Sequence, residues 1–237
     1  IQSKNLDVKQ LMTGSIAHNI ETIRRDLPPS VRLMAVSKQV SVEAIRAAYG
    51  MGIRDFGESR IQEAESKQQE LTDLPDLCWH LIGHLQGNKV RKAVQMFDWI
   101  HSVDSLKLAN QIDRVSAELG VKPKICLQVK ILPDPDKYGW TIPELLADLP
   151  QLALCQQLDI RGLMAIPPLG LTIAQTQAFF DQARDLSHQI AACTSVRDRS
   201  NIQMSELSMG MSGDYLQAIA AGATTIRLGS IIFGNRL

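Results

Sequence analysis

Lys38 is a lysine whose sequence neighbours could make its amine a nucleophile. It follows the apolar residues 33–36, which have the length and composition of a buried strand, and a helix start is expected at Ser41. Lys38 would then lie at the carboxyl end of a strand, where parallel α/β proteins bind ligands. A partly desolvated amine can lose its proton and attack a carbonyl group to form a Schiff base. Since most lysines at strand ends are solvated or ion-paired, Lys38 alone is a candidate and not yet a site.

Two segments near the end of the sequence have the composition of a phosphate-binding site. Residues 208–214 read SMGMSGD, and residues 227–230 read RLGS. Glycine lets backbone approach a ligand, and N–H groups at a helix start bind anions. Barrel enzymes often bind phosphate in the loops after strands 7 and 8. A tight turn capped by serine would explain either segment alone. The occurrence of both segments at the two expected loops favours a phosphate site.

Strand-like and helix-like segments alternate along the whole chain. We predict strands at residues 32–38, 54–57, 79–83, 99–103, 124–131, 159–164, 204–207 and 224–228. We predict helices at residues 41–50, 60–71, 87–96, 105–119, 142–152, 172–191 and 213–221. An extra N-terminal helix is expected from an apolar stripe that runs from Met12 to Leu27.

Eight strands that alternate with helices predict an α/β fold, a (β/α)8 barrel with an N-terminal helix. A doubly wound open sheet is the main alternative. The even strand spacing and the lack of GxGxxG after the first strand disfavour it. The eighth strand ends close to residue 237, so we expect one domain over residues 1–237.

The charge balance favours a small ligand over a polyanionic partner. Lysine plus arginine and aspartate plus glutamate both number 25, and 45% of the residues are hydrophobic. Neither nucleic-acid nor membrane binding is therefore predicted. No basic-then-apolar leader and no run of eighteen apolar residues is present, so we expect a cytoplasmic location.

The cysteine and histidine spacings do not predict a metal site. The four cysteines, 78, 126, 155 and 193, form no CxxC pair and are expected to be reduced thiols. His80 and His84 have HxxxH spacing, but they fall on a strand and the loop after it rather than on a helix.

Several motifs taken together resemble the pyridoxal 5'-phosphate (PLP) homeostasis protein family, whose barrel is related to that of alanine racemase. They are AVSK at 35–38, FGE at 56–58, WHLIG at 79–83, LQ and NK at 85–89, RGLM at 161–164, LSMGMS at 207–212, RLG at 227–229 and FG at 233–234. They cover nearly the whole chain. One departure is Ser59, where the family usually has asparagine, and another is Lys130, where it also has asparagine.

The resemblance implies a binding site for PLP as cofactor. It implies that Lys38 holds PLP as a Schiff base and that Arg227 reaches the pyridine nitrogen. Groups around the phosphate would come from Ser208, Gly210, Ser212, Gly229 and Ser230, with Ser59 as a further contact.

The function implied by the resemblance is PLP homeostasis without robust catalysis. An arginine at the pyridine nitrogen disfavours its protonation, which makes the ring a weak electron sink. Racemases also take a second base, a tyrosine, from a separate C-terminal domain that is not expected here. We predict no catalytic residues and a monomer that buffers or delivers PLP, possible partners being PLP-dependent apoenzymes or a regulatory protein.

Three alternatives remain open at the level of sequence. The chain could be a small PLP-dependent racemase-like enzyme, or a PLP-sensing regulatory protein that acts through a protein partner. It could also be a barrel that acts on another phosphorylated small molecule, with Lys38 as an ordinary base.

Overall fold

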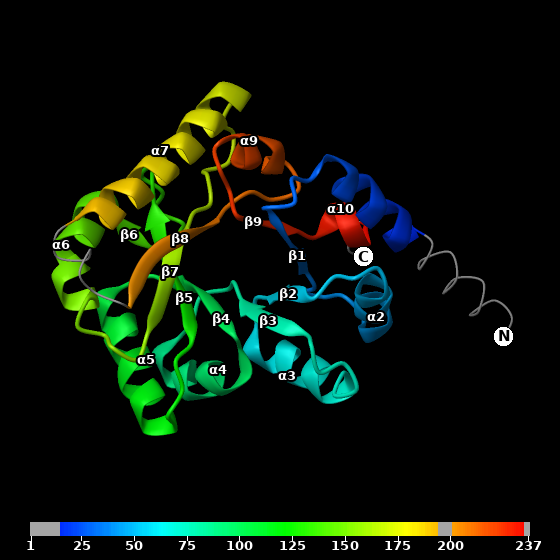
Figure 1. Ribbon diagram of the computed structural model, residues 1–237, viewed down its shortest axis with the longest axis horizontal. Helices are drawn as coiled ribbons and strands as arrows, with labels where there is room; N and C mark the ends of the chain where they lie inside the picture. Colours follow the sequence, from blue (N-terminus) through cyan, green and yellow to red (C-terminus); the bar gives the residue numbers. More distant parts are fainter. Residues whose placement is uncertain (1–14, 194–200, 235–237) are drawn as a thin grey trace, which may run out of the picture.

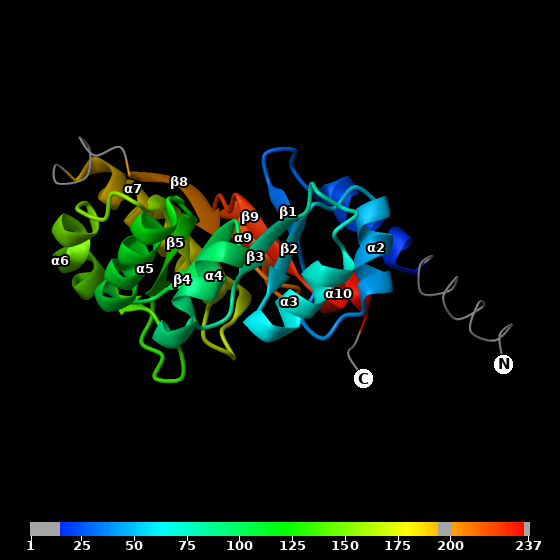
Figure 2. The same ribbon diagram turned by 90° about the horizontal axis from the view of Figure 1, so that it is seen from below.

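Eight parallel strands close into a barrel, and the helices surround it (Figures 1 and 2). The computed structural model describes residues 15–193 and 201–234. The barrel strands are β1 (Arg32–Val36), β2 (Asp55–Glu58), β3 (Cys78–Leu81), β4 (Trp99–Val103), β5 (Lys124–Lys130), β7 (Asp159–Met164), β8 (Ile202–Ser208) and β9 (Thr225–Leu228). β1 lies between β2 and β9, and pairing of β4 with β5 closes the ring. The predicted (β/α)8 architecture is confirmed.

The helices follow the strands in the predicted order. They are α2 (Val42–Gly50), α3 (Ile61–Glu70), α4 (Val90–Met96), α5 (Leu106–Leu119), α6 (Ile142–Leu152), α7 (Ile173–Ala192), α9 (Tyr215–Ala220) and α10 (Ser230–Phe233). Residues 15–26 are also helical, as the apolar stripe predicts, although Met12 lies outside the described residues. Among the described residues, no helix has the length and apolar character needed to cross a bilayer.

The helix predicted at residues 87–96 begins as the 3-10 helix η1 (Gly87–Lys89) and continues as α4. Two short elements were not predicted: β6 (Trp140–Thr141) pairs in parallel with the end of β5, and α10 spans four residues after β9. Elements of two to four residues are too short to show a hydrophobic period.

Polar side chains at the helix starts explain where several helices begin. Thr141 and Thr172 each form a capping box. Each threonine side chain accepts a hydrogen bond from the backbone three residues on, and the side chain there, Glu144 or Gln175, accepts from the backbone N–H of the threonine. Ser105 caps α5 in the simpler way, by accepting from the backbone N–H of Leu108.

The strands are buried on both faces, because helices cover the outside and side chains fill the inside. All five residues of β4 and all four residues of β9 are buried. The strand positions that face the helices join one large hydrophobic core. A separate small cluster consists of Trp99, Cys126 and Met164 from three neighbouring strands, and the ring of His80 stacks on Trp99. The barrel interior is therefore partly polar.

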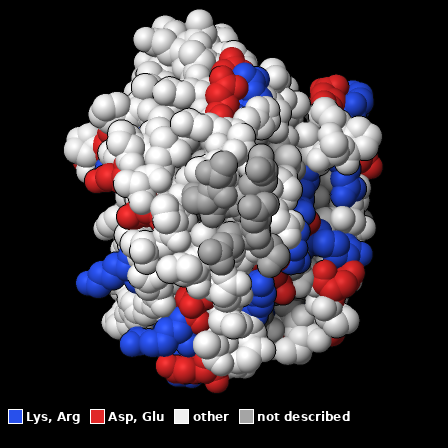
Figure 3. All heavy atoms as spheres, turned by 60° about the vertical axis from the view of Figure 1, so that its left-hand side comes forward, with Lys and Arg blue, Asp and Glu red and all other residues white. Residues whose placement is uncertain are grey.

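Basic and acidic side chains are intermixed on the face shown in Figure 3. Ion pairs also join opposite charges along α7, where Arg184 pairs with both Asp181 and Asp185. On this face the charges form no one-signed patch of the kind that binds nucleic acid.

Candidate functional site

A cavity of about 480 Å³ opens at the carboxyl ends of the barrel strands. Its lining residues follow or end β1, β2, β3, β7, β8 and β9, and they are Val36, Lys38, Ser59, Ile82, Ile166, Met211, Ser212, Gly213, Arg227, Gly229 and Ser230. This is the end of a parallel barrel where ligands bind. The volume falls in the range of small-molecule sites.

The structure brings six of the eight sequence-predicted site residues to this cavity. They are Lys38, Ser59, Ser212, Arg227, Gly229 and Ser230. Ser208 and Gly210 do not line it. The Ser208 hydroxyl is buried within the barrel, 2.8 Å from Nδ1 of His101, and Gly210 packs against α9, where an added Cβ would lie 2.6 Å from Cβ of Ala218.

Lys38 extends from a strand end that three side chains hold in place. The Ser37 hydroxyl donates to Oε1 of Glu58 at 2.7 Å, and Nζ of Lys67 donates to the Ser37 carbonyl at 2.6 Å. On the other side of Lys38, the backbone N–H of Gln39 donates to Glu63, and Gln39 has a left-handed φ of 58°. The backbone on both sides of Lys38 is thus fixed.

Burial and hydrogen bonding shift the pKa in opposite directions at the two carboxyl groups, Glu58 and Glu63, that hold the backbone on either side of Lys38. Burial raises the pKa of Glu58, even though hydrogen bonds from Lys67 and Ser37 oppose the change. Burial also acts to raise the pKa of Glu63, but hydrogen bonds from Lys67 and from the Gln39 backbone outweigh it and leave that pKa lowered. Glu58, the glutamate of the FGE motif, is fully buried and belongs to this support.

Arg227 is a buried cation at the floor of the cavity. Its guanidinium donates to the Ser208 carbonyl, to Oγ of Ser208 at 2.9 Å and to the Ala165 carbonyl at 3.1 Å. Burial lowers the pKa of Arg227 to about 10, so the side chain stays charged at neutral pH. The charge of Asp214 opposes this lowering of the Arg227 pKa, and burial raises the pKa of the Asp214 carboxyl.

Several polar residues in the loops after β3, β4 and β5 lie outside this cavity. His84 pairs with Asp104 at 3.0 Å, and its ring stacks on the exposed Tyr138 with 3.6 Å between ring centroids. His84 lines a smaller neighbouring pocket, which shares Ser59 with the main cavity. Lys130 lines a third pocket after β5.

Comparison with known proteins identifies the family. The family described as alanine racemase, N-terminal domain, matches residues 12–236. The pyridoxal phosphate homeostasis protein of Synechocystis is 54% identical over 211 residues, which are 89% of this chain and 94% of that protein. The protein of that name from Pseudomonas aeruginosa is 40% identical over 88% of this chain and 86% of its own length. The chain belongs to the pyridoxal phosphate homeostasis protein family.

Solved structures agree with this membership. PipY of Synechococcus elongatus, solved with PLP bound, is 56% identical and covers 92% of this chain and 100% of its own, with a TM-score of 0.86. Alanine racemase of Clostridium difficile is 13% identical with a TM-score of 0.72, and the matched part is 57% of that chain. The racemase shares the barrel fold, and this chain spans little more than half of its length.

The sequence did not reveal the role of several residues that shape the site. Lys67 lies in a helix of charged and polar residues, where a lysine is usually solvated. His101 gave no sequence signal, and His80, although part of the WHLIG motif and of an HxxxH spacing, was assigned no role in the site. The apolar lining residues Ile82 and Ile166 look like ordinary core residues in the sequence.

Proposed function

We propose that this protein binds PLP at Lys38 and serves to buffer or deliver the cofactor in vitamin B6 homeostasis, without robust catalytic turnover. The observation that carries the proposal is the joint presence of Lys38 and Arg227 in one cavity with the glycine-containing loops after β8 and β9. A relative that shares 56% of its residues was solved with PLP bound.

The donor set of the cavity fits the chemical groups of PLP. The cofactor carries an aldehyde, a phosphate and a pyridine ring nitrogen. Lys38 supplies the amine, and residues 212–213 and 229–230 supply backbone at the start of α9 and α10. No aspartate or glutamate is among the described residues that line the cavity, so no carboxylate there repels the phosphate.

The position of Arg227 favours binding over carbanion chemistry. When bound, PLP supplies an aldehyde that joins a lysine amine and a ring that can accept electrons. Arg227 is charged and can only donate hydrogen bonds, so next to the ring nitrogen of bound PLP it would favour the unprotonated form of that nitrogen. An unprotonated ring withdraws electrons weakly.

The cavity also offers few groups for proton transfer. Of the residues that line it in the described part of the chain, Lys38 and Arg227 are the ones with charged side chains. A racemase needs a base on each face of the substrate. Tyr138, the tyrosine closest to a strand end, is 56% exposed and stacks on His84 outside the cavity.

We also propose that the protein is one domain over residues 1–237 and acts in the cytoplasm as a monomer.

The decisive experiment is the visible spectrum of the purified protein with added PLP, before and after borohydride reduction, followed by peptide mapping. We expect a reducible band whose label maps to Lys38. Lys38→Ala should abolish the band, and Lys130→Ala should retain it, since Lys130 lies outside the cavity. A label on another lysine, or no band, would overturn the proposed site.

A second measurement separates a carrier from an enzyme. The protein with PLP is incubated with L-alanine in deuterium oxide, and exchange of the Cα hydrogen and formation of D-alanine are followed. We expect rates close to those of free PLP. Turnover at an enzyme-like rate that Lys38→Ala abolishes would instead support a racemase-like enzyme.

A further inference from the structure

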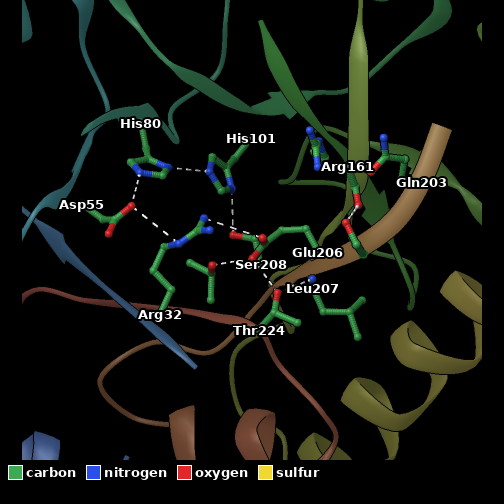
Figure 4. A network of polar contacts seen from close by, with 12 residues as sticks. Arg32, Asp55, His80, His101, Arg161, Gln203, Glu206, Leu207, Ser208 and Thr224 are labelled. Carbon is green, nitrogen blue, oxygen red and sulfur yellow. Dashed lines mark hydrogen bonds and ion pairs between the residues drawn. The ribbon is translucent and has the colours of Figure 1, made fainter. Parts of the chain in front are cut away.

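A row of hydrogen bonds passes through the barrel interior, from the ligand end to the opposite end (Figure 4). Oγ of Ser208 lies 2.8 Å from Nδ1 of His101, and Nε2 of His101 lies 2.9 Å from Nδ1 of His80. Nε2 of His80 lies 2.9 Å from Oδ1 of Asp55. Ser208 ends β8 and Asp55 begins β2, so this relay connects the two ends of the barrel. At the ligand end it continues to Arg227, whose Nη1 donates to Oγ of Ser208.

The two ends of the relay determine the direction of every hydrogen bond in it. Asp55 faces the guanidinium of Arg32 at 3.6 Å, and as a carboxylate it can only accept, so His80 carries its proton on Nε2. A neutral imidazole has one donor and one acceptor, so Nδ1 of His80 accepts from Nε2 of His101.

The same reasoning continues to the cavity. With its proton on Nε2, His101 accepts at Nδ1, and Ser208 must place its hydroxyl hydrogen there. Oγ of Ser208 then accepts from Arg227, which can only donate. All the hydrogen bonds therefore point from Arg227 toward Asp55, and no donor faces another donor.

Burial keeps both imidazoles in the neutral form that this arrangement needs. Burial lowers the pKa of His80, although the hydrogen bond to Asp55 opposes the change. Burial, together with the positive charges of Arg227 and Arg32, lowers the pKa of His101 further. Protonation of either ring would give it two donors and break one link.

We propose that the relay orients Arg227 at the cofactor ring, so that its members act as positioning residues for PLP binding. These residues are Ser208, His101, His80 and Asp55. The proposal rests on the proposed PLP site and adds to it. In this proposal the Ser208 hydroxyl donates its hydrogen bond to His101 and not to the phosphate of PLP. Because the links are directional, a change at either end alters the hydrogen bonding at the other.

The first test measures the relay without cofactor. Nitrogen-15 NMR of the histidine-labelled full chain reports which ring nitrogen carries the proton. We expect protonated Nε2 and unprotonated Nδ1 for both His80 and His101. A proton on Nδ1 of either ring, or a doubly protonated ring at neutral pH, would overturn the proposal whether or not PLP binds.

The second test adds PLP to the same labelled protein. Neither histidine lines the cavity, yet the relay predicts that their ring resonances shift when PLP binds, whereas the exposed His188 on α7 stays unchanged. If the visible band forms but the rings of His80 and His101 do not respond, the relay proposal fails while the PLP site stands. If no band forms, the proposed function fails.

A variant provides an independent measurement. His101→Phe removes the acceptor for Ser208 and should weaken PLP binding at least about tenfold and move the visible band, while His188→Gln should leave both unchanged. Equal affinity and an identical spectrum in a folded His101→Phe protein would contradict the proposal. If that variant does not fold, the two NMR measurements on the wild-type chain still decide the question.

Discussion

Nζ of Lys67 lies 2.8 Å from Oε1 of Glu58, and both side chains are almost completely withdrawn from solvent. The same lysine donates to Oε1 of Glu63 and to the carbonyl of Ser37, the residue before Lys38. A second lysine, from α3, therefore fixes the end of β1 from which the candidate PLP lysine extends. Glu58 retains one buried oxygen, Oε2, without a hydrogen-bond partner.

Replacing Lys67 should destabilise the protein strongly. Lys67→Met leaves the Glu58 carboxylate buried without its cation, and we expect a loss of about 3–5 kcal/mol in the free energy of unfolding. Lys92→Met is the matched control, because Lys92 pairs with Glu65 in a partly exposed ion pair whose loss should change stability by about 1 kcal/mol or less. Urea unfolding followed by circular dichroism measures both. Equal losses of unfolding free energy in the two variants would mean that the buried Lys67–Glu58 pair contributes no more to stability than the exposed pair.

Replacing Arg227 should reduce stability as well as PLP binding. Arg227→Met removes the donor from two buried carbonyls and from the Ser208 hydroxyl, and we expect destabilisation of at least about 2 kcal/mol. Arg161→Met is the control, since Arg161 makes its contacts to Asp159 and Gln203 near the surface and should change stability by less than about 1 kcal/mol. Urea unfolding without cofactor separates this effect from binding. If Arg227→Met is as stable as the wild type, the hydrogen bonds of Arg227 do not contribute to stability as predicted.

The two buried histidines predict that stability falls in mild acid. Burial lowers the pKa of each in the folded protein, so below about pH 6.5 the unfolded chain takes up protons that the folded chain does not. Their stabilising contribution is complete above that pH and is lost as pH falls, by up to about 1.4 kcal/mol per pH unit for each histidine.

Unfolding free energies measured between pH 7.5 and 5 test this prediction. His101→Gln removes one of the two groups, so its stability should fall less steeply with pH than that of the wild type. His188→Gln, a change at an exposed helix position, should keep the wild-type slope. Identical slopes for wild type and His101→Gln would mean that His101 is protonated in the folded barrel.

A methyl group at Gly162 should disrupt the pairing of β7 and β8. An added Cβ would lie 1.7 Å from the backbone oxygen of Glu206, so one of the two strands must move. We expect Gly162→Ala to cost several kcal/mol, or to prevent folding. Gly50→Ala is the control, because an added Cβ at the end of α2 meets nothing within 4 Å and φ there is not positive. It should be neutral or stabilise by up to about 1 kcal/mol. Thermal unfolding compares the two, and similar midpoints would refute the close approach.

The fold and the main features of the cavity were predictable because they depend on local patterns. Buried strands and amphipathic helices show in runs of four to twenty residues, and eight alternating units admit few arrangements. The barrel then brings Lys38, Arg227 and the loops after β8 and β9 to one end, because parallel strands place their carboxyl ends together.

The residues that support the site depend on contacts between distant parts of the chain. Lys67 meets a carbonyl 30 residues away, and His101 meets a hydroxyl 107 residues away. A lysine in a polar helix and a histidine in a strand look alike in sequence whether they are solvated or buried. The sequence by itself determined the order of the elements, the barrel and the lysine at the end of its first strand. Only the tertiary structure decided which polar side chains face inward, because closure of the barrel removes water and leaves each buried group to find a partner within the protein.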